Sequence, residues 1–271
     1  MSVRAGRNSI LLVLSLPALL LVILPLLGLF WSAQLSRIGS YICCGPVMAA
    51  LTLSLTTSGI TALLVIILGT PLAYWLAYGN FRGKRFFDTL VDLPVVLPPA
   101  VAGVALLMTF GRVGLIGKHL SAAGITIPFT TAAVVLAQSF VAGPFYIRQA
   151  RVGFESVPRQ LMMASLTMGA SPLRTFFRVT APLASHAILA GIVMAWARAV
   201  GEFGATLMFA GNLQGVTQTM PLAIYTTLES NPNAAIVLSV TLIVISFLVI
   251  IVTKSLLGTT PKQSQARRSR S

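Results

Sequence analysis

The chain has 271 residues, of which 56% are hydrophobic and only 9% are charged. This composition excludes a soluble globular domain and indicates an integral membrane protein. The formal net charge of +14 is compatible with nucleic-acid binding, but the basic residues gather on one side of the expected membrane helices, so we expect no nucleic-acid partner.

Apolar runs long enough to cross a bilayer recur along the chain. A hydrocarbon core about 30 Å thick requires roughly 20 helical residues. The runs are continuously apolar and lack the period-two alternation of barrel strands. They predict an all-α integral membrane protein with a single transmembrane domain over residues 1–271. The six expected helices cover residues 10–33, 49–78, 93–110, 128–147, 183–207 and 234–256.

The distribution of basic residues sets the expected orientation. All Lys and Arg residues fall on the N-terminal side of the membrane except Arg37, Arg112 and Lys118, which fall outside, and Arg198, which lies in the fifth helix. By the positive-inside rule both termini are cytoplasmic. The first apolar run is too long for a signal peptide, so we expect it to be retained. The basic tail, residues 258–271, is expected to lie at the anionic lipid surface.

The third expected helix carries Pro94, Pro98 and Pro99 near its inner end. Proline removes a backbone donor and disrupts the helix before it. We therefore expect an interruption there, with freed backbone groups lining a cavity.

The polar segment of residues 151–182 lies between the fourth and fifth expected helices and cannot itself cross a bilayer. Ser156 and Pro158 are typical of a helix start, with a hydroxyl cap and a proline in the first turn. Gly169 is typical of a helix end. Ser171 and Pro172 predict a second short helix that ends at Pro182. The segment thus predicts a cytoplasmic helix–glycine–helix unit, which is a docking surface.

The first short helix is rich in methionine, whose flexible thioether adapts to irregular pockets on a partner. Packing against the ends of the protein's own helices is the alternative, and opposite faces of one helix can do both. The candidate docking residues are Pro158, Leu161, Met162, Met163, Ala164, Leu166, Met168, Gly169, Ala170 and Pro172.

The sequence contains no recognisable nucleotide-binding motif and no recognisable set of catalytic residues. The stretch from Gly111 to Lys118 has one residue too many between its outer glycines for a nucleotide-binding loop, and His119 stands where a hydroxyl is required. No metal-ligand spacing exists, and the adjacent Cys43 and Cys44 lie near the outer start of the second helix. We expect neither an enzyme nor a metal site, with energy supplied by a separate chain.

Of the five acidic residues only Glu202 falls at membrane depth, and Arg198 precedes it by four residues. Two interpretations remain open. The two residues form a self-neutralising pair on one helix face, or one of them faces a translocation path and sets its electric field or gates it. Thr206 is a further candidate for the path. The scarcity of intramembrane acids disfavours an ATP-independent channel or secondary carrier, because carriers use such residues to bind coupling ions.

The spacing from Gly169 to Pro182 resembles the cytoplasmic signature of permease subunits of binding-protein-dependent ABC importers. In that signature a glycine is followed after nine residues by Ile-x-Leu-Pro, which Val179–Pro182 replaces here. Met162–Ala164 stands where the family usually has Glu-Ala-Ala. Residues 93–99, 110–117, 144–151 and 197–225 resemble the molybdate/sulfate branch of the family.

This resemblance implies the type I ABC importer permease fold in a bacterial-type plasma membrane. It implies a homodimer with two ATP-binding cassette ATPase subunits inside and a soluble substrate-binding protein outside. ATP and Mg²⁺ would be bound by the ATPase, and no cofactor by this chain. The transported solute would be a tetrahedral oxyanion. Residues 110–117 favour molybdate or tungstate over the alternative, sulfate or thiosulfate.

Overall fold

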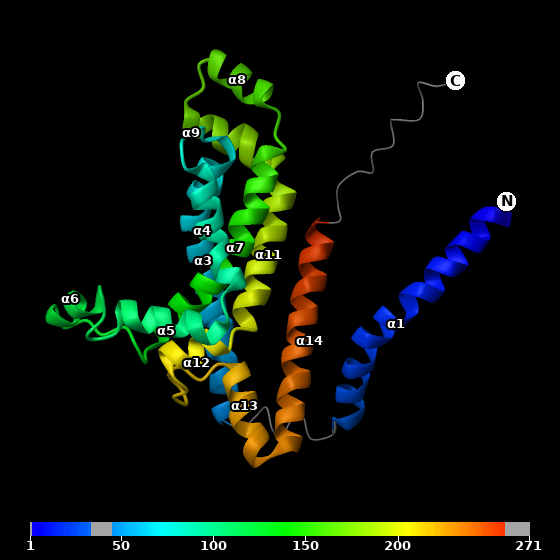
Figure 1. Cartoon of the computed structure of the whole chain (residues 1–271), viewed down its shortest axis with the longest axis vertical. Coiled ribbons are helices and arrows are strands. Elements are labelled where there is room, and N and C mark those ends of the chain that lie inside the picture. Colours follow the sequence, from blue (N-terminus) through cyan, green and yellow to red (C-terminus); the bar gives the residue numbers. More distant parts are fainter. Residues whose placement is uncertain (1, 34–44, 258–271) are drawn as a thin grey trace.

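The computed structural model describes residues 2–33 and 45–257, and these residues form helices joined by short connections (Figure 1). The expectations for Cys43, Cys44 and the basic tail concern residues outside this described part. The helices are α1 (Ser2–Ser32), α3 (Gly45–Tyr78), α4 (Lys84–Val96), α5 (Pro99–Phe110), α6 (Gly117–Ala122), α7 (Thr131–Glu155), α8 (Arg159–Thr167), α9 (Pro172–Thr175), the π-helix η2 (Phe176–Thr180), α10 (Ala181–Leu183), α11 (Ser185–Val200), α12 (Gly204–Ala210), α13 (Met220–Ser230) and α14 (Pro232–Leu257).

Three stretches are long and apolar enough to cross a membrane: Leu14–Ser32 in α1, all of α3, and Pro232–Val252 in α14. Two bent helix pairs, α4 with α5 and α9–α10 with α11, each meet the same criterion when taken together. Among the described residues, length and composition therefore support three spans, or five when each bent pair counts as one.

The expectation of one helix over residues 93–110 is wrong, whereas the expected interruption by proline is confirmed. The chain turns by 115° between α4 and α5. Proline restricts the residue before it to extended backbone, and Leu97, which precedes Pro98, has φ −65° and ψ 134°. Pro99 then occupies the first turn of α5, where its missing N–H costs nothing.

The expected fifth helix, residues 183–207, is also divided. It bends by 76° near Ala184 and ends at Val200, and α12 begins only at Gly204. Glycine at position 201 closes α11, and residues 201–203 are not helical. Glu202 therefore lies between two helices and not within one.

The fourth expected helix, residues 128–147, corresponds to α7, which begins three residues later at Thr131 and continues to Glu155. α7 is not among the stretches apolar enough to pass as a span. Its position explains this: α7 packs between α3 and α11 and holds buried residues along its whole length (Figure 1). A helix enclosed by protein can carry Gln138, Gly143 and Pro144 without exposing them to lipid.

Small residues let α7 and α11 approach closely. A Cβ added at Gly153 would lie 2.6 Å from the Cβ of Ala187, and one added at Gly191 would lie 3.2 Å from the carbonyl oxygen of Tyr146. Close approach through small residues is the usual way in which membrane helices pack. The three helices α3, α7 and α11 thus form the core to which the remaining elements attach.

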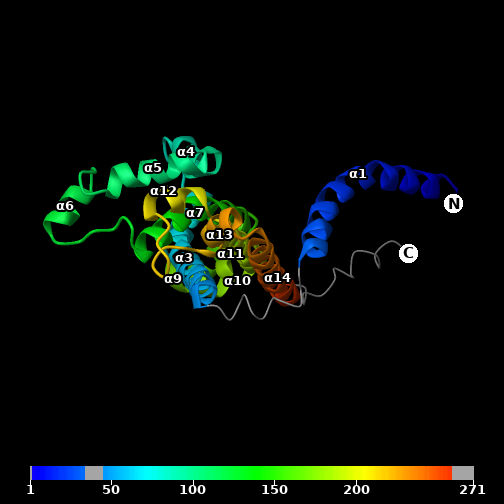
Figure 2. The same cartoon turned by 90° about the horizontal axis from the view of Figure 1, so that it is seen from below.

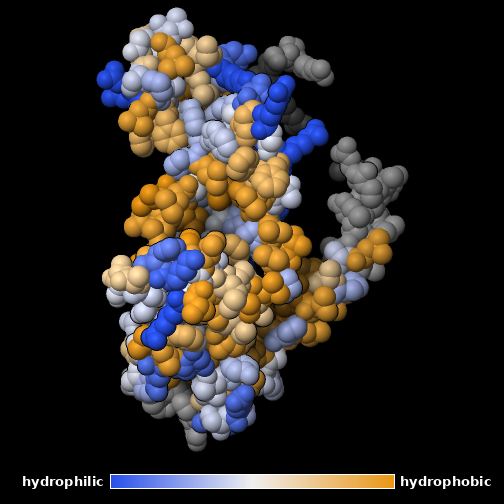
Figure 3. All heavy atoms as spheres, turned by 60° about the vertical axis from the view of Figure 1, so that its left-hand side comes forward, coloured by the Kyte–Doolittle hydropathy of each residue, from blue (hydrophilic) through white to orange (hydrophobic). Residues whose placement is uncertain are grey.

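The core carries α8 and α9 at one end and α13 at the other (Figure 1). The helices α5 and α6 project to one side, and α4 lies outside α7 (Figure 2). On the face drawn in Figure 3, hydrophilic residues lie at the end that carries α8 and again in the lower half, with a band of hydrophobic residues between them. This arrangement suits a molecule whose α8 end stands in water.

Candidate docking segment and buried ion pair

The segment of residues 151–182 leaves the core at the end of α7. Ser156 does not cap α8 as predicted: its hydroxyl donates to the carbonyl of Gly153 at 2.7 Å and so closes α7. Pro158 is the residue before α8, which has no side-chain cap. Buried Val157 joins the hydrophobic cluster of the core and anchors the connection.

Gly169 ends α8 as the sequence predicts. Its φ is +85°, and its N–H bonds to the carbonyl of Leu166 at 2.9 Å while Ala170 bonds to Ser165 at 3.1 Å. This pair of bonds is the Schellman motif, which satisfies the last carbonyls of a helix. A Cβ at Gly169 would meet no atom within 4 Å, so the backbone conformation alone requires glycine.

The second short helix also begins as predicted, because the Ser171 hydroxyl accepts a bond from the N–H of Arg174 at 3.3 Å and Pro172 occupies the first turn. It does not end at Pro182. The π-helical turn η2 precedes that proline, with the N–H of Ala181 bonded to the carbonyl of Phe176. The helical path continues through α10, and the widened turn accommodates a residue that has no N–H to donate.

The structure divides the candidate docking residues between two faces of α8. Met162 packs against the core cluster and Ser165 is buried, with its hydroxyl 2.9 Å from that of Thr175. In contrast, Met163 is 61% exposed and Met168 is 81% exposed. The remaining candidates Pro158, Leu161, Ala164, Leu166, Gly169 and Pro172 are exposed, and Ala170 is half-buried.

An aromatic cluster fixes the base of this segment to α3 and α7. The ring of Tyr74 packs edge-on against Phe154 and Phe176, with centroid distances of 5.6 and 5.4 Å. The Tyr78 hydroxyl donates to the carbonyl of Phe154 at 2.6 Å. η2 therefore contacts both core helices, and α8 reaches them through η2 and Met162.

Ion pairs between α4 and α7, which the sequence reasoning missed, lie beside the same end. Arg151 pairs with Asp88 and, at 2.8 Å, with Glu155, and Arg148 pairs with Asp92. The hydrogen bond to Asp92 raises the pKa of the Arg148 guanidinium above its ordinary value. Acids four residues apart in α4 and arginines three apart in α7 were the available signal, because these spacings place each pair on one helix face.

Arg198 and Glu202 form an ion pair. Arg198 Nη1 lies 2.7 Å from Glu202 Oε2, and the Glu202 side chain is 1% exposed. Glu202 Oε1 also accepts a bond from the N–H of Ala205 at 2.8 Å, near the start of α12. Thr206 is fully buried, and its hydroxyl has no hydrogen-bond partner in the described part of the chain. The structure thus joins Arg198 and Glu202 and places Thr206 one turn further along.

The two helix breaks lie against each other. A Cβ at Gly204 would lie 2.7 Å from the Cβ of Pro99, and one at Gly103 would lie 2.6 Å from the Cβ of Met208. The α4–α5 break therefore packs on the α11–α12 break that holds Glu202. Non-helical backbone at membrane depth is tolerated where it is buried in protein or lines a water-filled cavity.

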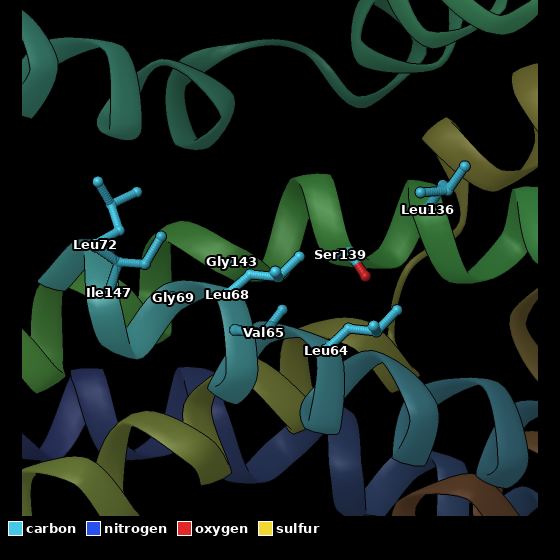
Figure 4. A pocket seen from close by; sticks show the side chains of 9 residues that line it. All are labelled: Leu64, Val65, Leu68, Gly69, Leu72, Leu136, Ser139, Gly143 and Ile147. Atoms are coloured by element: carbon cyan, nitrogen blue, oxygen red, sulfur yellow. The ribbon is translucent and has the colours of Figure 1, made fainter.

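A cavity of about 190 Å³ lies between α3 and α7 (Figure 4). Leucine side chains of α3 and Leu136 of α7 border it, and Ser139 contributes its one hydroxyl. An apolar crevice of this kind does not suit an anion. The charged candidates for a translocation path are therefore at the helix breaks and not in this cavity.

Apolar spans, paired helix breaks and an exposed helix–glycine–helix segment together define a membrane transport component. The chain belongs to the family of binding-protein-dependent transport system inner membrane components, which matches it over residues 69–257.

Several relatives within that family are permeases of molybdenum transport systems. The molybdenum transport system permease protein ModB of Mycobacterium tuberculosis is 41% identical over 237 residues, which cover 88% of this chain and 90% of that protein. The protein of the same name from Escherichia coli is 39% identical over 75% of this chain and 92% of its own. A probable transport system permease protein, NifC of Clostridium pasteurianum, is 40% identical over 74% of this chain and 71% of its own.

Solved ABC importers share the fold. A chain of a bacterial transporter that imports the acidic polysaccharide alginate aligns with 95% of this chain and 98% of its own, with a TM-score of 0.75 and 14% identity. A chain of the inward-facing MetNI methionine transporter aligns with 79% of this chain and 97% of its own, with a TM-score of 0.61 and 19% identity. The resemblance between α3–α14 and ABC importer permeases, noted in the sequence, is thereby confirmed at the level of fold.

Proposed function

We propose that this chain is the membrane-spanning subunit of an ATP-driven importer of molybdate, with tungstate as a close analogue. The observation that carries the proposal is the identity of about 40% to permeases of molybdenum transport systems over most of the chain. ATP hydrolysis takes place on a separate ATPase, and a soluble receptor delivers the anion from outside.

In this proposal α8 is the surface that the ATPase grips. Its outward face offers Met163 and Met168, while Met162 and Ser165 hold the helix to the core. The rigid base formed by Tyr74, Phe154 and Phe176 then transmits motion of α8 into α3 and α7. Coupling by a short, stiffly based helix supports alternation between inward-open and outward-open states.

The translocation path runs past the two helix breaks. A tetrahedral dianion requires a polar route with some positive bias, and Arg198 is 29% exposed beside its buried partner Glu202. Because the pair is neutral overall, the passage binds the anion weakly and the soluble receptor provides selectivity. A second copy of the chain completes the path, each copy contributing six membrane helices with cytoplasmic termini.

The proposal is tested by reconstituting the chain in proteoliposomes with its ATPase and its soluble receptor. We expect uptake of radiolabelled molybdate that requires ATP and all three components. Tungstate should compete at similar concentration, whereas sulfate and thiosulfate should not. Uphill uptake by this chain alone would identify a secondary carrier and contradict the proposal.

Sulfate competing as well as molybdate would transfer the assignment to the sulfate and thiosulfate importers.

Topology is tested separately with Cys43 and Cys44, which are the two cysteines of the sequence. An impermeant maleimide added outside intact cells should label them, and labelling only after lysis would reverse the proposed orientation.

A further inference from the structure

The corner between α3 and α4 combines free cations with a cavity. Arg82, Lys84 and Arg85 directly follow the long apolar helix α3, and none of the three forms an ion pair within the described residues. Beside them lies a cavity of about 500 Å³, lined by Lys84, Arg85 and Arg151 together with Asn80, Phe81 and Asp88. The cations outnumber the single carboxylate, so the cavity favours an anion.

Aromatic rings border the same corner. Trp75 stacks on Phe81 with a centroid distance of 4.1 Å and an interplanar angle of 14°, and Phe87 meets both rings edge-on at 5.4 and 6.0 Å. Tryptophan at the end of a membrane helix is typical of the headgroup level of a bilayer, where one side of the ring is apolar and the other is wet.

The helix α4 turns its two carboxylates toward α7 and an apolar face outward. Asp88 and Asp92 pair with arginines of α7, whereas Phe86, Leu90 and Leu93 are 66%, 49% and 47% exposed. These three residues are spaced by one helical turn and share a face. No residue of α4 is buried. This apolar face begins at Phe86, one residue after Arg85, so the first turn of α4 brings apolar surface and free cations together, as the acyl chains and the anionic headgroup of a phospholipid require.

We propose that this corner binds an anionic phospholipid of the cytoplasmic leaflet. Lys84 and Arg85 hold the phosphate in the cavity, with Arg82 beside it, and the acyl chains lie along Phe86, Leu90 and Leu93. A free oxyanion shares the phosphate chemistry but would make no use of the apolar stripe. The inference depends on the proposed orientation of the chain and not on the solute it transports.

The position of the lipid gives it a regulatory role. Arg151 lines the cavity and also pairs with Asp88 and Glu155, so the headgroup lies against the ion pairs that fix α4 to the end of α7. From that end the chain continues into α8. A bound lipid therefore stiffens the base through which α8 acts.

Trp75 is a built-in probe of this site. The chain has three tryptophans, and Trp31→Phe with Trp196→Phe leaves Trp75 alone. The full chain would be placed in phosphatidylcholine vesicles that contain equal fractions of brominated phosphatidylglycerol or brominated phosphatidylcholine. We expect at least about fivefold enrichment of the anionic lipid around Trp75, since each basic residue strengthens binding to an anionic leaflet by about this factor.

Lys84→Gln with Arg85→Gln should remove most of this preference. The matched control, Arg112→Gln with Lys118→Gln, removes two outer cations and should leave it unchanged. Equal quenching by both lipids in the otherwise unsubstituted chain would overturn the proposal without need of a charge variant. Loss of the preference in the control, or its abolition by millimolar inorganic phosphate or molybdate, would also overturn it. Failure of molybdate uptake would contradict the proposed function but would not alter this quenching.

Discussion

The helices α7 and α8 are separated by only three residues, yet they are held by different kinds of contact. More than half of α7 is buried, and Gly153 lets α11 approach it closely. In α8 one residue of nine, Ser165, is buried, and a single hydroxyl pair joins it to α9. Larger side chains in the core around α7 would force its helices apart, whereas the outward residues of α8 can change without disturbing the packing of this chain. The fold therefore fixes α7 more strictly than it fixes the outward face of α8.

The largest effect on stability is expected at the ion pair between Arg198 and Glu202. Arg198→Ala should destabilise the chain by about 3–5 kcal/mol, because it leaves the buried Glu202 carboxylate without a counter-charge. Thermal unfolding in detergent measures this loss. Arg198→Ala combined with Glu202→Gln should recover most of the stability. If the double variant is stable but does not transport, Arg198 acts in the path; if it transports normally, the pair is structural.

Gly153→Leu tests the close contact between α7 and α11. The new Cβ would lie 2.6 Å from that of Ala187, so the helices must separate at a cost of about 1–3 kcal/mol or more. Fluorescence-detected size-exclusion chromatography should show less folded protein. Gly59→Leu is the matched control, because nothing lies within 4 Å of Gly59. Equal behaviour of the two variants would mean that the close contact does not limit folding.

Gly169→Val tests the turn that ends α8. A β-branched residue in the left-handed conformation costs about 1–2 kcal/mol, so the turn should open while the core remains folded. We expect loss of ATP-dependent uptake with normal membrane insertion and little change in melting temperature. Gly169→Asn should retain much of the uptake, since asparagine tolerates this conformation. Normal uptake by the valine variant would remove the coupling role from the turn.

Ser165→Ala should have the smallest effect on stability, about 1 kcal/mol, because it leaves the buried Thr175 hydroxyl without its partner. The helix α8 should then transmit motion less well, so that ATP hydrolysis by the complex exceeds transport by a larger factor. Thr167→Ala, at an exposed position on the same helix, is the control. An unchanged ratio of hydrolysis to transport would show that this hydroxyl pair plays no part in coupling.

Short sequence patterns predicted most of the turns and helix ends in residues 151–182. Gly169 and the Ser171–Pro172 pair behave as their conformational preferences require, because turns and caps are decided by a few adjacent residues. The role of Ser156 and the end of the second short helix at Pro182 were mispredicted, because neighbouring residues allow more than one local structure. Ser156 closes the preceding helix instead of opening the next, and a π-helical turn before Pro182 is not encoded in any short pattern.

Long-range arrangement was harder to predict. Hydropathy located the expected helix of residues 183–207 but could not reveal its division, because the break before Gly204 packs against Pro99, a residue far away in the sequence. The pairing of α4 with α7 depends on side chains that are more than 50 residues apart, such as Asp88 and Arg151. The spacing of Arg198 and Glu202, in contrast, was local enough to read directly.

The contact between Gly204 and Pro99 has a consequence for sequence variation. Position 204 has room for a hydrogen and nothing larger as long as residue 99 carries a Cβ, and Pro99 occupies the first turn of α5 directly after the bend from α4. Gly204 therefore cannot be exchanged alone. In a library randomised at both positions and selected for growth on scarce molybdate, survivors should keep Gly204 unless position 99 also becomes glycine.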